Sequence, residues 1–204
     1  MVDTLYSIGY SGFSVDEFIY TLHKKQVSLV VDVRSHPYSQ WFSAYNRENI
    51  AQTLKKAGIY YRNYSSEFGA RQEDKNYYSR DGYLDFELFS KSPQFIHGME
   101  KLITSMKKDY CFVLMCAEKD PFNCHRTMLV SRAFHDAGYH VVHLMPNGKE
   151  IMHEEIESRL LETYFPNRNQ TTLFAEPRSD KEYLVESYRK RNSEIGYSME
   201  DENK

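Results

Sequence analysis

The chain has 204 residues and a formal net charge of −3, with 27% charged and 15% aromatic residues. This length suits one domain with a core of its own, and the slightly acidic balance excludes a uniformly basic surface, although not a local basic pocket. The three cysteines are too few, and odd in number, for a disulfide framework. The sequence shows neither a signal-peptide pattern nor an apolar run of bilayer length, so we expect a cytoplasmic protein without a membrane partner.

Apolar runs alternate with segments of helical periodicity along most of the chain. The apolar runs predict five strands, at residues 4–11, 27–35, 59–64, 110–117 and 139–145. The helical segments predict five helices, at residues 14–26, 46–58, 92–109, 124–138 and 150–165. Strands that alternate with helices are joined by right-handed crossovers, so we expect a three-layer α/β domain with a mainly parallel sheet of about five strands.

Local signals mark the ends of several elements. Ser14 stands three residues before Glu17, in the register of a capping box, and Gly58 and Gly138 are predicted to end helices. Residues 64–82 are polar and irregular, and we expect them near the functional face.

The composition changes after Pro166. Residues 166–204 are charged and poor in core residues. We therefore divide the chain into an α/β domain at residues 1–165 and a charged C-terminal tail at residues 166–204, part of which can be helical against the body.

The residues that follow the predicted strands are the first candidates for a site, because ligands of open α/β sheets bind beyond the carboxyl ends of the strands. They are Tyr10 and Ser11 after the first strand, Asp32, Arg34, Ser35 and His36 after the second, and Cys116, Glu118, Cys124, His125 and Arg126 around the fourth. We expect these groups to converge on one edge of the sheet.

Cys124 is predicted to lie in the first turn of the helix that follows Pro121. Unpaired backbone N–H groups and the helix dipole favour an anion there, and Arg126 adds a positive charge. The turn could therefore hold a phosphate or carboxylate. The same field could instead lower the pKa of Cys124 and make it a nucleophile, or the cysteine could simply pack beneath the turn.

The other cysteines favour simpler interpretations. Cys116 and Cys111 lie in an apolar run, where a cysteine usually behaves as a small hydrophobic residue. A metal held by Cys116, Cys124 and a histidine such as His125 or His36 is a less favoured alternative, because C-x7-C matches none of the usual tight zinc spacings. We therefore predict no cofactor.

The stretch VVDVRSHP places Asp32 and Arg34 on the same side of a buried strand, since side chains alternate. Buried charges need partners, so the two residues could form a structural ion pair. Alternatively, Arg34 could bind an anion in the pocket, together with Arg71 from the irregular segment.

Five motifs resemble those of a known family, the domain of unknown function numbered 488. They are IGYSGFSVDEFI, VVDVRSHPYSQWFSAYN, KAGIYYRNY, SPQF and CAEKDPFNCHR, and the similarity covers roughly residues 4–165. The resemblance implies a compact Rossmann-like α/β domain whose recurrent residues gather on one face, and it implies no secure activity. Tyr10 stands where the family usually has histidine, and EFGAR replaces Leu-Gly-Gly-Arg, so only Gly69 and Arg71 carry over there.

A second resemblance lies in the predicted tail. NQTTLF, with Gln170, Leu173 and Phe174, is similar to the pentapeptide that binds the bacterial DNA sliding clamp, although Thr171 replaces the usual leucine. The partner-binding residues would be Gln170, Leu173 and Phe174. Alternatively, Leu173 and Phe174 hold the tail on the body.

Three functions follow as hypotheses. The favoured one is an enzyme that acts on a phosphate-bearing small molecule or nucleic acid, with Glu118 as general acid or base and Cys116 or Cys124 as a nucleophile. Its substrate-binding residues would be Ser11, Asp32, Arg34, Arg71, His125 and Arg126. The alternatives are a non-catalytic anion-binding adaptor recruited through its tail, and a metal- or redox-dependent cysteine enzyme.

Overall fold

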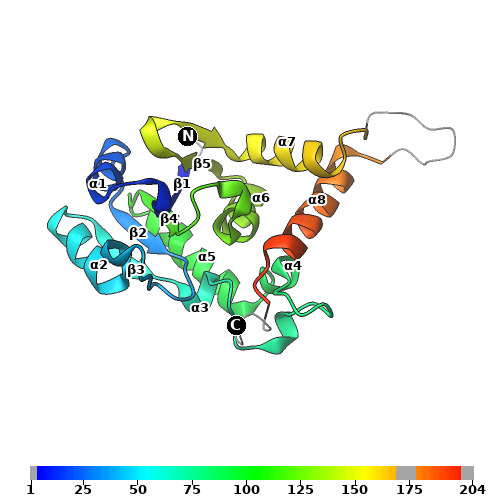
Figure 1. Cartoon of the computed structure of the whole chain (residues 1–204), viewed down its shortest axis with the longest axis horizontal. Coiled ribbons are helices and arrows are strands. Elements are labelled where there is room, and N and C mark those ends of the chain that lie inside the picture. The colour runs from blue at the N-terminus through cyan, green and yellow to red at the C-terminus, as the bar shows by residue number, and fades with distance from the viewer. Residues whose placement is uncertain (1–3, 169–177, 199–204) are drawn as a thin grey trace.

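The computed structural model, which describes residues 4–168 and 178–198, contains a six-stranded sheet in the order β3-β2-β4-β1-β5-β6 (Figure 1). The strands are β1 (Thr4–Gly9), β2 (Leu29–Asp32), β3 (Tyr60–Asn63), β4 (Phe112–Cys116), β5 (His140–Leu144) and β6 (Glu150–Met152). The first five run parallel, and only β6 pairs antiparallel, with β5. The predicted α/β fold with a mainly parallel sheet is confirmed, with one more strand than the five expected.

Helices connect the strands and cover both faces of the sheet. They are α1 (Val15–Lys24), α2 (Arg47–Lys56), α3 (Ser65–Phe68), α4 (Phe86–Phe89), α5 (Pro93–Met106), the π-helix η5 (Arg126–Ser131), α6 (Arg132–Asp136), α7 (His153–Tyr164) and α8 (Asp180–Ile195). Short 3₁₀ helices lie at Tyr10–Gly12 (η1), Ser43–Tyr45 (η2), Lys75–Tyr77 (η3), Pro121–Asn123 (η4) and Pro146–Gly148 (η6). Within residues 4–168 and 178–198, none of the helices combines the length and the apolar character that a bilayer crossing requires.

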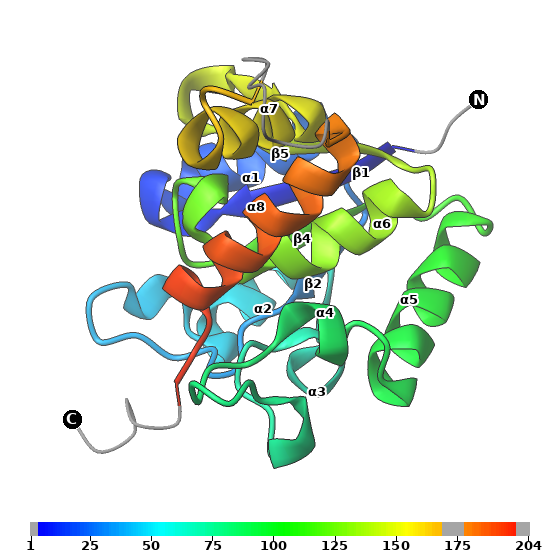
Figure 2. The ribbon, with the colours of Figure 1, turned by 90° about the vertical axis from the view of Figure 1, so that its right-hand side faces the viewer.

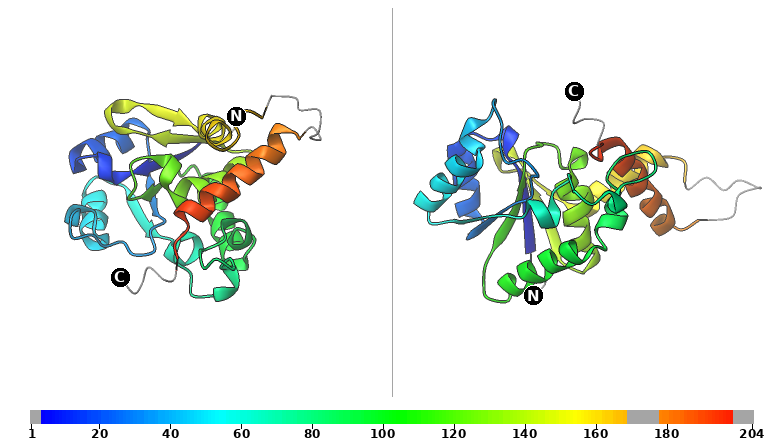
Figure 3. Two further views of the ribbon diagram at one scale, coloured as in Figure 1. Left: turned by 45° about the vertical axis from the view of Figure 1, so that its right-hand side comes forward. Right: turned by 90° about the horizontal axis from the view of Figure 1, so that it is seen from below.

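The alternation of side chains along the strands builds two cores, one on each face of the sheet. Residues such as Val30 and Val113 pack against α1 and α2 on one face. Their neighbours Val31 and Leu114 face the other side, where α5, η5, α6 and α7 contribute the apolar side chains. The view from below shows the sheet between these two helical layers (Figure 3).

The predicted helix signals act as expected at both ends. The Ser14 hydroxyl accepts the Glu17 N–H, and the Glu17 carboxylate accepts the Ser14 N–H at 3.0 Å, which completes the capping box before α1. After α2, Gly58 adopts the left-handed φ of 75° that a residue without a Cβ takes most easily.

One predicted helix begins too early. Residues 150–152 form strand β6 instead of the first turn of a helix, and α7 begins at His153. The reason is the turn before them: Asn147 and Gly148 have φ values of 61° and 73°, which reverse the chain so that Glu150 pairs with Leu144. The helical periodicity of 150–165 concealed this short edge strand.

The segment that we assigned to a charged tail contains α8, which packs against α7 and η5 (Figure 2). Asn192 fixes it to the body, because its amide accepts the Phe86 N–H at 2.8 Å and donates to the Leu84 carbonyl at 2.9 Å. The predicted clamp-binding residues Gln170, Leu173 and Phe174 lie outside the described residues. Sliding-clamp binding therefore stays a sequence-based prediction.

Candidate active site

The carboxyl ends of β1, β2 and β4 open into a cavity of about 540 Å³. Its lining includes Tyr10, Arg34, His36, Arg71, Cys116, Glu118, His125 and Tyr197, so that groups from the strand ends, the loop after β2 and the residues after α8 meet there. Among the predicted site residues, Arg34, Arg71, Cys116, Glu118 and His125 line this cavity. The described lining does not include Ser11, Asp32, Cys124 or Arg126.

Four potential ligand or proton-transfer groups meet at the floor of the cavity. The Oε2 atom of Glu118 lies 3.0 Å from the Cys116 sulfur and 2.9 Å from the Cys124 sulfur. His125 Nδ1 lies 3.8 Å from the Cys116 sulfur. Both cysteines are buried, whereas Glu118 keeps a solvent-exposed face and turns Oε2 inward. We call Cys116, Glu118, Cys124 and His125 the floor cluster.

The backbone around η4 brings the second half of the floor cluster up to the first. Cys116 is the last residue of β4, and Asp120 caps η4 by accepting the Phe122 N–H. Cys124 has an extended backbone, and its carbonyl accepts the N–H groups of Thr127 and Met128. Cys124 is therefore the residue just before the helix. The prediction that it lies in the first turn is wrong by one residue. Its side chain still lies at the positive end of the helix dipole.

Burial and neighbouring charges shift the protonation of these groups in opposite directions. Burial raises the pKa of the Cys116 thiol and of the Glu118 carboxyl. Burial alone would also raise the pKa of Cys124. However, the hydrogen bond to Cys116 and the charges of Arg126 and His125 outweigh it, so this pKa lies below its usual range. Cys124 is therefore the sulfur that loses its proton more readily.

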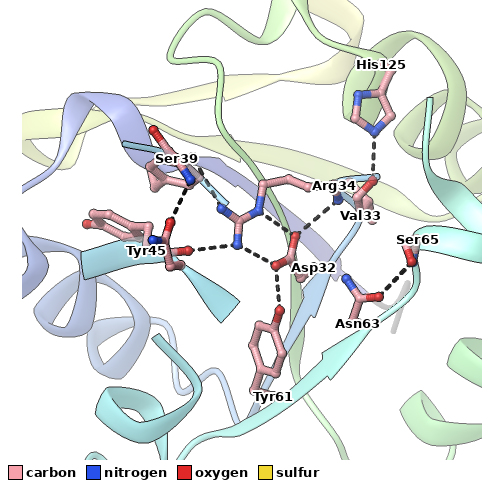
Figure 4. Close-up of polar contacts among 11 residues, drawn as sticks. Asp32, Val33, Arg34, Ser39, Tyr45, Tyr61, Asn63, Ser65 and His125 are labelled. Carbon is pink, nitrogen blue, oxygen red and sulfur yellow. Dashed lines mark hydrogen bonds and ion pairs between the residues drawn. The ribbon is translucent and has the colours of Figure 1, made fainter. Parts of the chain in front are cut away.

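His125 directs its Nδ1 atom toward the cysteines because its other ring nitrogen, Nε2, is hydrogen-bonded to a backbone carbonyl. Its Nε2 lies 2.9 Å from the Val33 carbonyl, to which it donates (Figure 4). In the neutral ring this leaves an unprotonated Nδ1 facing the sulfurs. Burial alone would lower the pKa of His125, but contact with Cys124 and Glu118 raises it.

Arg126 lies beneath the floor cluster and is fully buried. Its Nη1 donates to the Glu118 carbonyl at 2.6 Å and its Nε donates to the Ser7 hydroxyl at 3.4 Å, while Nη2 has no hydrogen-bond partner among the described residues. We predicted that Arg126 binds the substrate. In the structure it lies outside the described lining of the cavity and contacts the Glu118 backbone, so substrate binding by Arg126 stays a prediction.

Gly9 is the residue that lets Glu118 approach β1. A Cβ at this position would lie 1.8 Å from the Glu118 carbonyl oxygen and 3.0 Å from Arg126 Nη1. We therefore expect Gly9→Ala to displace Glu118 and to lower the free energy of unfolding by about 1–3 kcal/mol, as overpacking does. In native protein, iodoacetamide should alkylate Cys116 and Cys124 faster than in the wild type.

Gly58→Ala is the matched control for Gly9→Ala. A Cβ added at position 58 would meet no atom within 4 Å beyond its chain neighbours, so the strain there is confined to the backbone. This variant should leave the alkylation of both buried cysteines slow. Equal alkylation rates in Gly9→Ala and the wild type would show that Gly9 does not hold the floor cluster closed.

Asp32 and Arg34 form a buried ion pair at the wall of the cavity (Figure 4). Arg34 donates to Asp32 from Nε at 2.9 Å and from Nη2 at 2.6 Å, and Tyr61 donates to the same carboxylate at 2.6 Å. Further donation to the Tyr45 carbonyl and the Tyr10 hydroxyl occupies four of the five guanidinium N–H groups. Arg34 therefore has at most one N–H, on Nη1, for a ligand.

Arg71 is the more available cation. It is exposed, it lines the cavity, and within the described part of the chain it forms no ion pair. Its guanidinium lies 4.2 Å from the centre of the Tyr197 ring, and its backbone N–H donates to the Ser35 hydroxyl. Together with His36 it also lines a second cavity of about 800 Å³, which shares four lining residues with the first. The two cavities are therefore adjacent, and we call them together the groove.

Several groups around the groove could not be predicted from sequence patterns. Tyr197 and Glu194 reach it from the end of α8, more than 60 residues after the floor cluster in the chain. Tyr61 and Tyr45, which complete the Asp32–Arg34 pair, come from β3 and η2. No local pattern announces such contacts, because they depend on how distant segments pack.

The family model described as Domain of unknown function DUF488 matches residues 14–133, more than half of the chain. No curated protein and no solved structure was found to match the chain.

Proposed function

The chain belongs to the DUF488 family, and we propose that it is an enzyme that acts on a phosphate-bearing substrate, a nucleotide or a nucleic acid, bound in the groove. The observation that carries this proposal is the floor cluster: an inward-turned carboxylate, two buried sulfurs and a histidine meet at the base of an open cavity. The exposed Arg71 lines the same cavity and forms no ion pair with the described residues. Convergent reactive groups in a concave site are the usual mark of an active site.

Arg71 and His36 are the groups that would bind a phosphate. Arginine presents a planar set of donors that suits phosphate oxygens, and the exposed position of Arg71 means that it loses little existing interaction on binding. The remaining N–H of Arg34 can add one contact. This division of roles differs from the sequence-based hypothesis, in which Arg34 and Arg126 held the anion.

The size and the aromatic edge of the groove favour a substrate larger than inorganic phosphate. Cavities of about 540 and 800 Å³ are each within the range that holds a nucleotide-sized ligand. The loop after β2 adds Tyr38, which lines the groove and is 70% exposed, and Tyr197 lines it from the end of α8. Exposed rings beside a cation are suited to stacking on bases.

Glu118 would transfer the proton in the reaction. It lines the cavity, and burial raises the pKa of its carboxyl, which brings that pKa closer to neutral pH. Cys116 is the sulfur that faces the cavity, and Cys124 lies behind it. A substrate in the groove would therefore meet Glu118 and Cys116 first.

Arg71→Gln tests the binding step. We expect it to weaken the binding of a nucleoside monophosphate and of a single-stranded oligonucleotide by at least about tenfold, because one charge-assisted hydrogen bond contributes about 1.5–3 kcal/mol. Isothermal titration calorimetry on protein treated with a chelator measures this effect without interference from metal ions.

Arg62→Gln is the control for the binding test, since Arg62 is an exposed arginine on β3 that lines another cavity. It should bind both ligands as the wild type does. Equal affinities of wild type and Arg71→Gln would exclude the proposed phosphate site. Ligand binding that depends on Arg71, without turnover of any nucleotide or oligonucleotide and without an effect of Glu118→Gln, would favour the adaptor hypothesis instead.

A further inference from the structure

We propose that the floor cluster is a metal site, in which Cys116 Sγ, Cys124 Sγ and His125 Nδ1 bind a Zn²⁺-type divalent cation and Glu118 closes the fourth position. This inference rests on the proposed function and deepens it, because it assigns the cofactor of the same site. From the sequence alone, the C-x7-C spacing of the two cysteines favoured the metal-free alternatives.

The four side chains supply a complete set of ligand atoms in one place. One ligand atom from each of Cys116, Glu118, Cys124 and His125 lies within 4.8 Å of every other. Two sulfurs, an imidazole nitrogen and a carboxylate oxygen are the donors that zinc takes in proteins, four at a time. The same donors suit magnesium and calcium poorly, since those ions prefer oxygen alone.

The surroundings of His125 fit a metal ligand. Donation from Nε2 to the Val33 carbonyl fixes the ring and leaves the lone pair of Nδ1 directed at the sulfurs. Zinc-bound histidines almost always donate their second ring nitrogen to a carbonyl or carboxylate in this way. Val33 comes from β2, so the neighbouring strand holds the ligand in place.

The charges also fit a divalent cation. An inward-turned carboxylate and two buried sulfurs lie within hydrogen-bond distance of one another, and Arg126 beneath them carries a permanent positive charge. A divalent cation among these groups would be coordinated by them and would balance their negative charge. The rigid strand end at Cys116 and the position of Cys124 just before the helix bring the two sulfurs together despite their C-x7-C spacing.

The position of Glu118 indicates what the metal would do. The three other ligands are buried or half-buried, whereas Glu118 is the solvent-facing member and borders the groove. A water or a phosphate oxygen in the groove could take its place, as the fourth position of catalytic zinc sites allows. The displaced carboxylate would then be free to accept a proton.

A Co²⁺ titration of the reduced, chelator-treated full chain tests the site. We expect one equivalent of Co²⁺ to produce thiolate-to-cobalt charge-transfer absorption and the d–d bands of tetrahedral coordination. Cys116→Ser and Cys124→Ser should each lower the affinity by more than about 100-fold, which is beyond the effect of outer-shell partners. Cys111→Ser is the matched control, because Cys111 lies apart from the cluster and contacts the Lys25 carbonyl, and it should bind Co²⁺ as the wild type does.

Two results would overturn the metal site. One is the absence of charge-transfer absorption in the reduced wild type, a readout that does not depend on any variant. The other is tight Co²⁺ binding by the double variant C116S/C124S, which would place the ion elsewhere, for instance at the second histidine-containing cluster of His135, His153 and Glu157.

The outcomes separate this inference from the proposed function. If Co²⁺ does not bind but Arg71→Gln still weakens nucleotide binding to the chelator-treated protein, the metal site is wrong and the phosphate site stands. If Co²⁺ binds through both cysteines but no nucleotide or oligonucleotide binds, the metal site stands and the phosphate-bearing substrate is wrong.

Discussion

Replacing Asp32 by asparagine is expected to lower the free energy of unfolding by about 3–5 kcal/mol, the usual cost of leaving one member of a buried ion pair without its partner. Asp32 is fully buried and Arg34 is 5% exposed, so water cannot replace the lost charge. Both Asp32 carboxylate oxygens accept hydrogen bonds from Arg34. The NH₂ group of an asparagine at this position cannot accept one, so it would face an Arg34 donor. Urea unfolding at neutral pH measures the effect.

Two further variants make the Asp32→Asn result specific. Asp81→Asn changes an exposed aspartate and should alter stability by no more than about 0.5 kcal/mol. The double variant D32N/R34M removes both charges and should recover most of the lost stability, since apolar replacement of a buried pair is often tolerated. A loss below about 1 kcal/mol in Asp32→Asn alone would show that the pair does not support the fold.

The outcome bears on function as well as stability. If Arg34 is held by Asp32, Tyr45 and Tyr10, it is a rigid wall of the groove with one donor left for a ligand. Arg71 then remains the main phosphate-binding group, and the two arginines would respond differently to substitution. Arg71→Gln should affect binding at unchanged stability, whereas loss of the Asp32–Arg34 pair should affect stability first.

Sequence patterns were sufficient to predict the α/β architecture, because hydrophobic periodicity and helix-end residues are local signals. The alternation in VVDVRS predicted a buried strand with Asp32 and Arg34 on one side. Strand β2 ends at Asp32, and Arg34, two residues beyond it, forms the predicted ion pair with Asp32. Cys116 and Glu118 could be placed at a strand end because the carboxyl ends of parallel strands share one edge. That edge is where the groove lies.

The remaining features depend on contacts between distant segments, which periodicity does not encode. Strand β6 exists because Asn147 and Gly148 turn the chain back onto β5. The approach of Cys124 to Cys116 depends on the η4 turn, and the spacing of the two residues alone argued against a shared site. Arg126 was expected to bind the substrate, but it is fully buried beneath the floor cluster, where it donates to the Glu118 carbonyl.

A buried row of hydrogen bonds also could not be predicted from the sequence. It runs from Arg126 through Ser7, His143 and His153 to Tyr188 of α8, with distances of 3.4, 2.6, 3.1 and 2.9 Å between successive polar atoms. Tyr188 then donates to Glu157 at 3.1 Å. The row links the cation under the floor cluster to α8, across strands that pair Ser7 with His143.

The two histidines of this row are held neutral. Burial lowers the pKa of both, and the neighbouring charges of His135 and of Arg126 or Arg132 add to the effect. The pKa of His153 falls to about 3. Both rings are almost completely enclosed, and each already has partners for its two nitrogens, so an added proton would have neither water nor an unused acceptor.

On acidification from pH 7.5 to pH 5, these two histidines are therefore expected to lower the free energy of unfolding by about 4 kcal/mol, about 2 kcal/mol each. The unfolded chain binds protons at both histidines below its ordinary pKa of about 6.5, whereas the folded chain does not bind one at His153 until about pH 3. Stability is thus present above pH 6.5 and is lost as the pH falls toward the folded value. The raised pKa values of Glu157, Glu118 and His125 oppose this trend, because each of these groups binds its proton more tightly in the folded chain.

Urea unfolding at pH 7.5 and pH 5 measures the difference, and substitution assigns it. His153→Gln cannot titrate but can still form hydrogen bonds, so it should lose about half of the pH dependence that the two histidines contribute. His97→Gln changes an exposed histidine of α5 and should keep all of it. An unchanged pH dependence in His153→Gln would show that the row does not hold its histidines neutral. Because the row ends on α8, the loss at pH 5 should first be visible as hydrogen exchange in α8, ahead of the central strands.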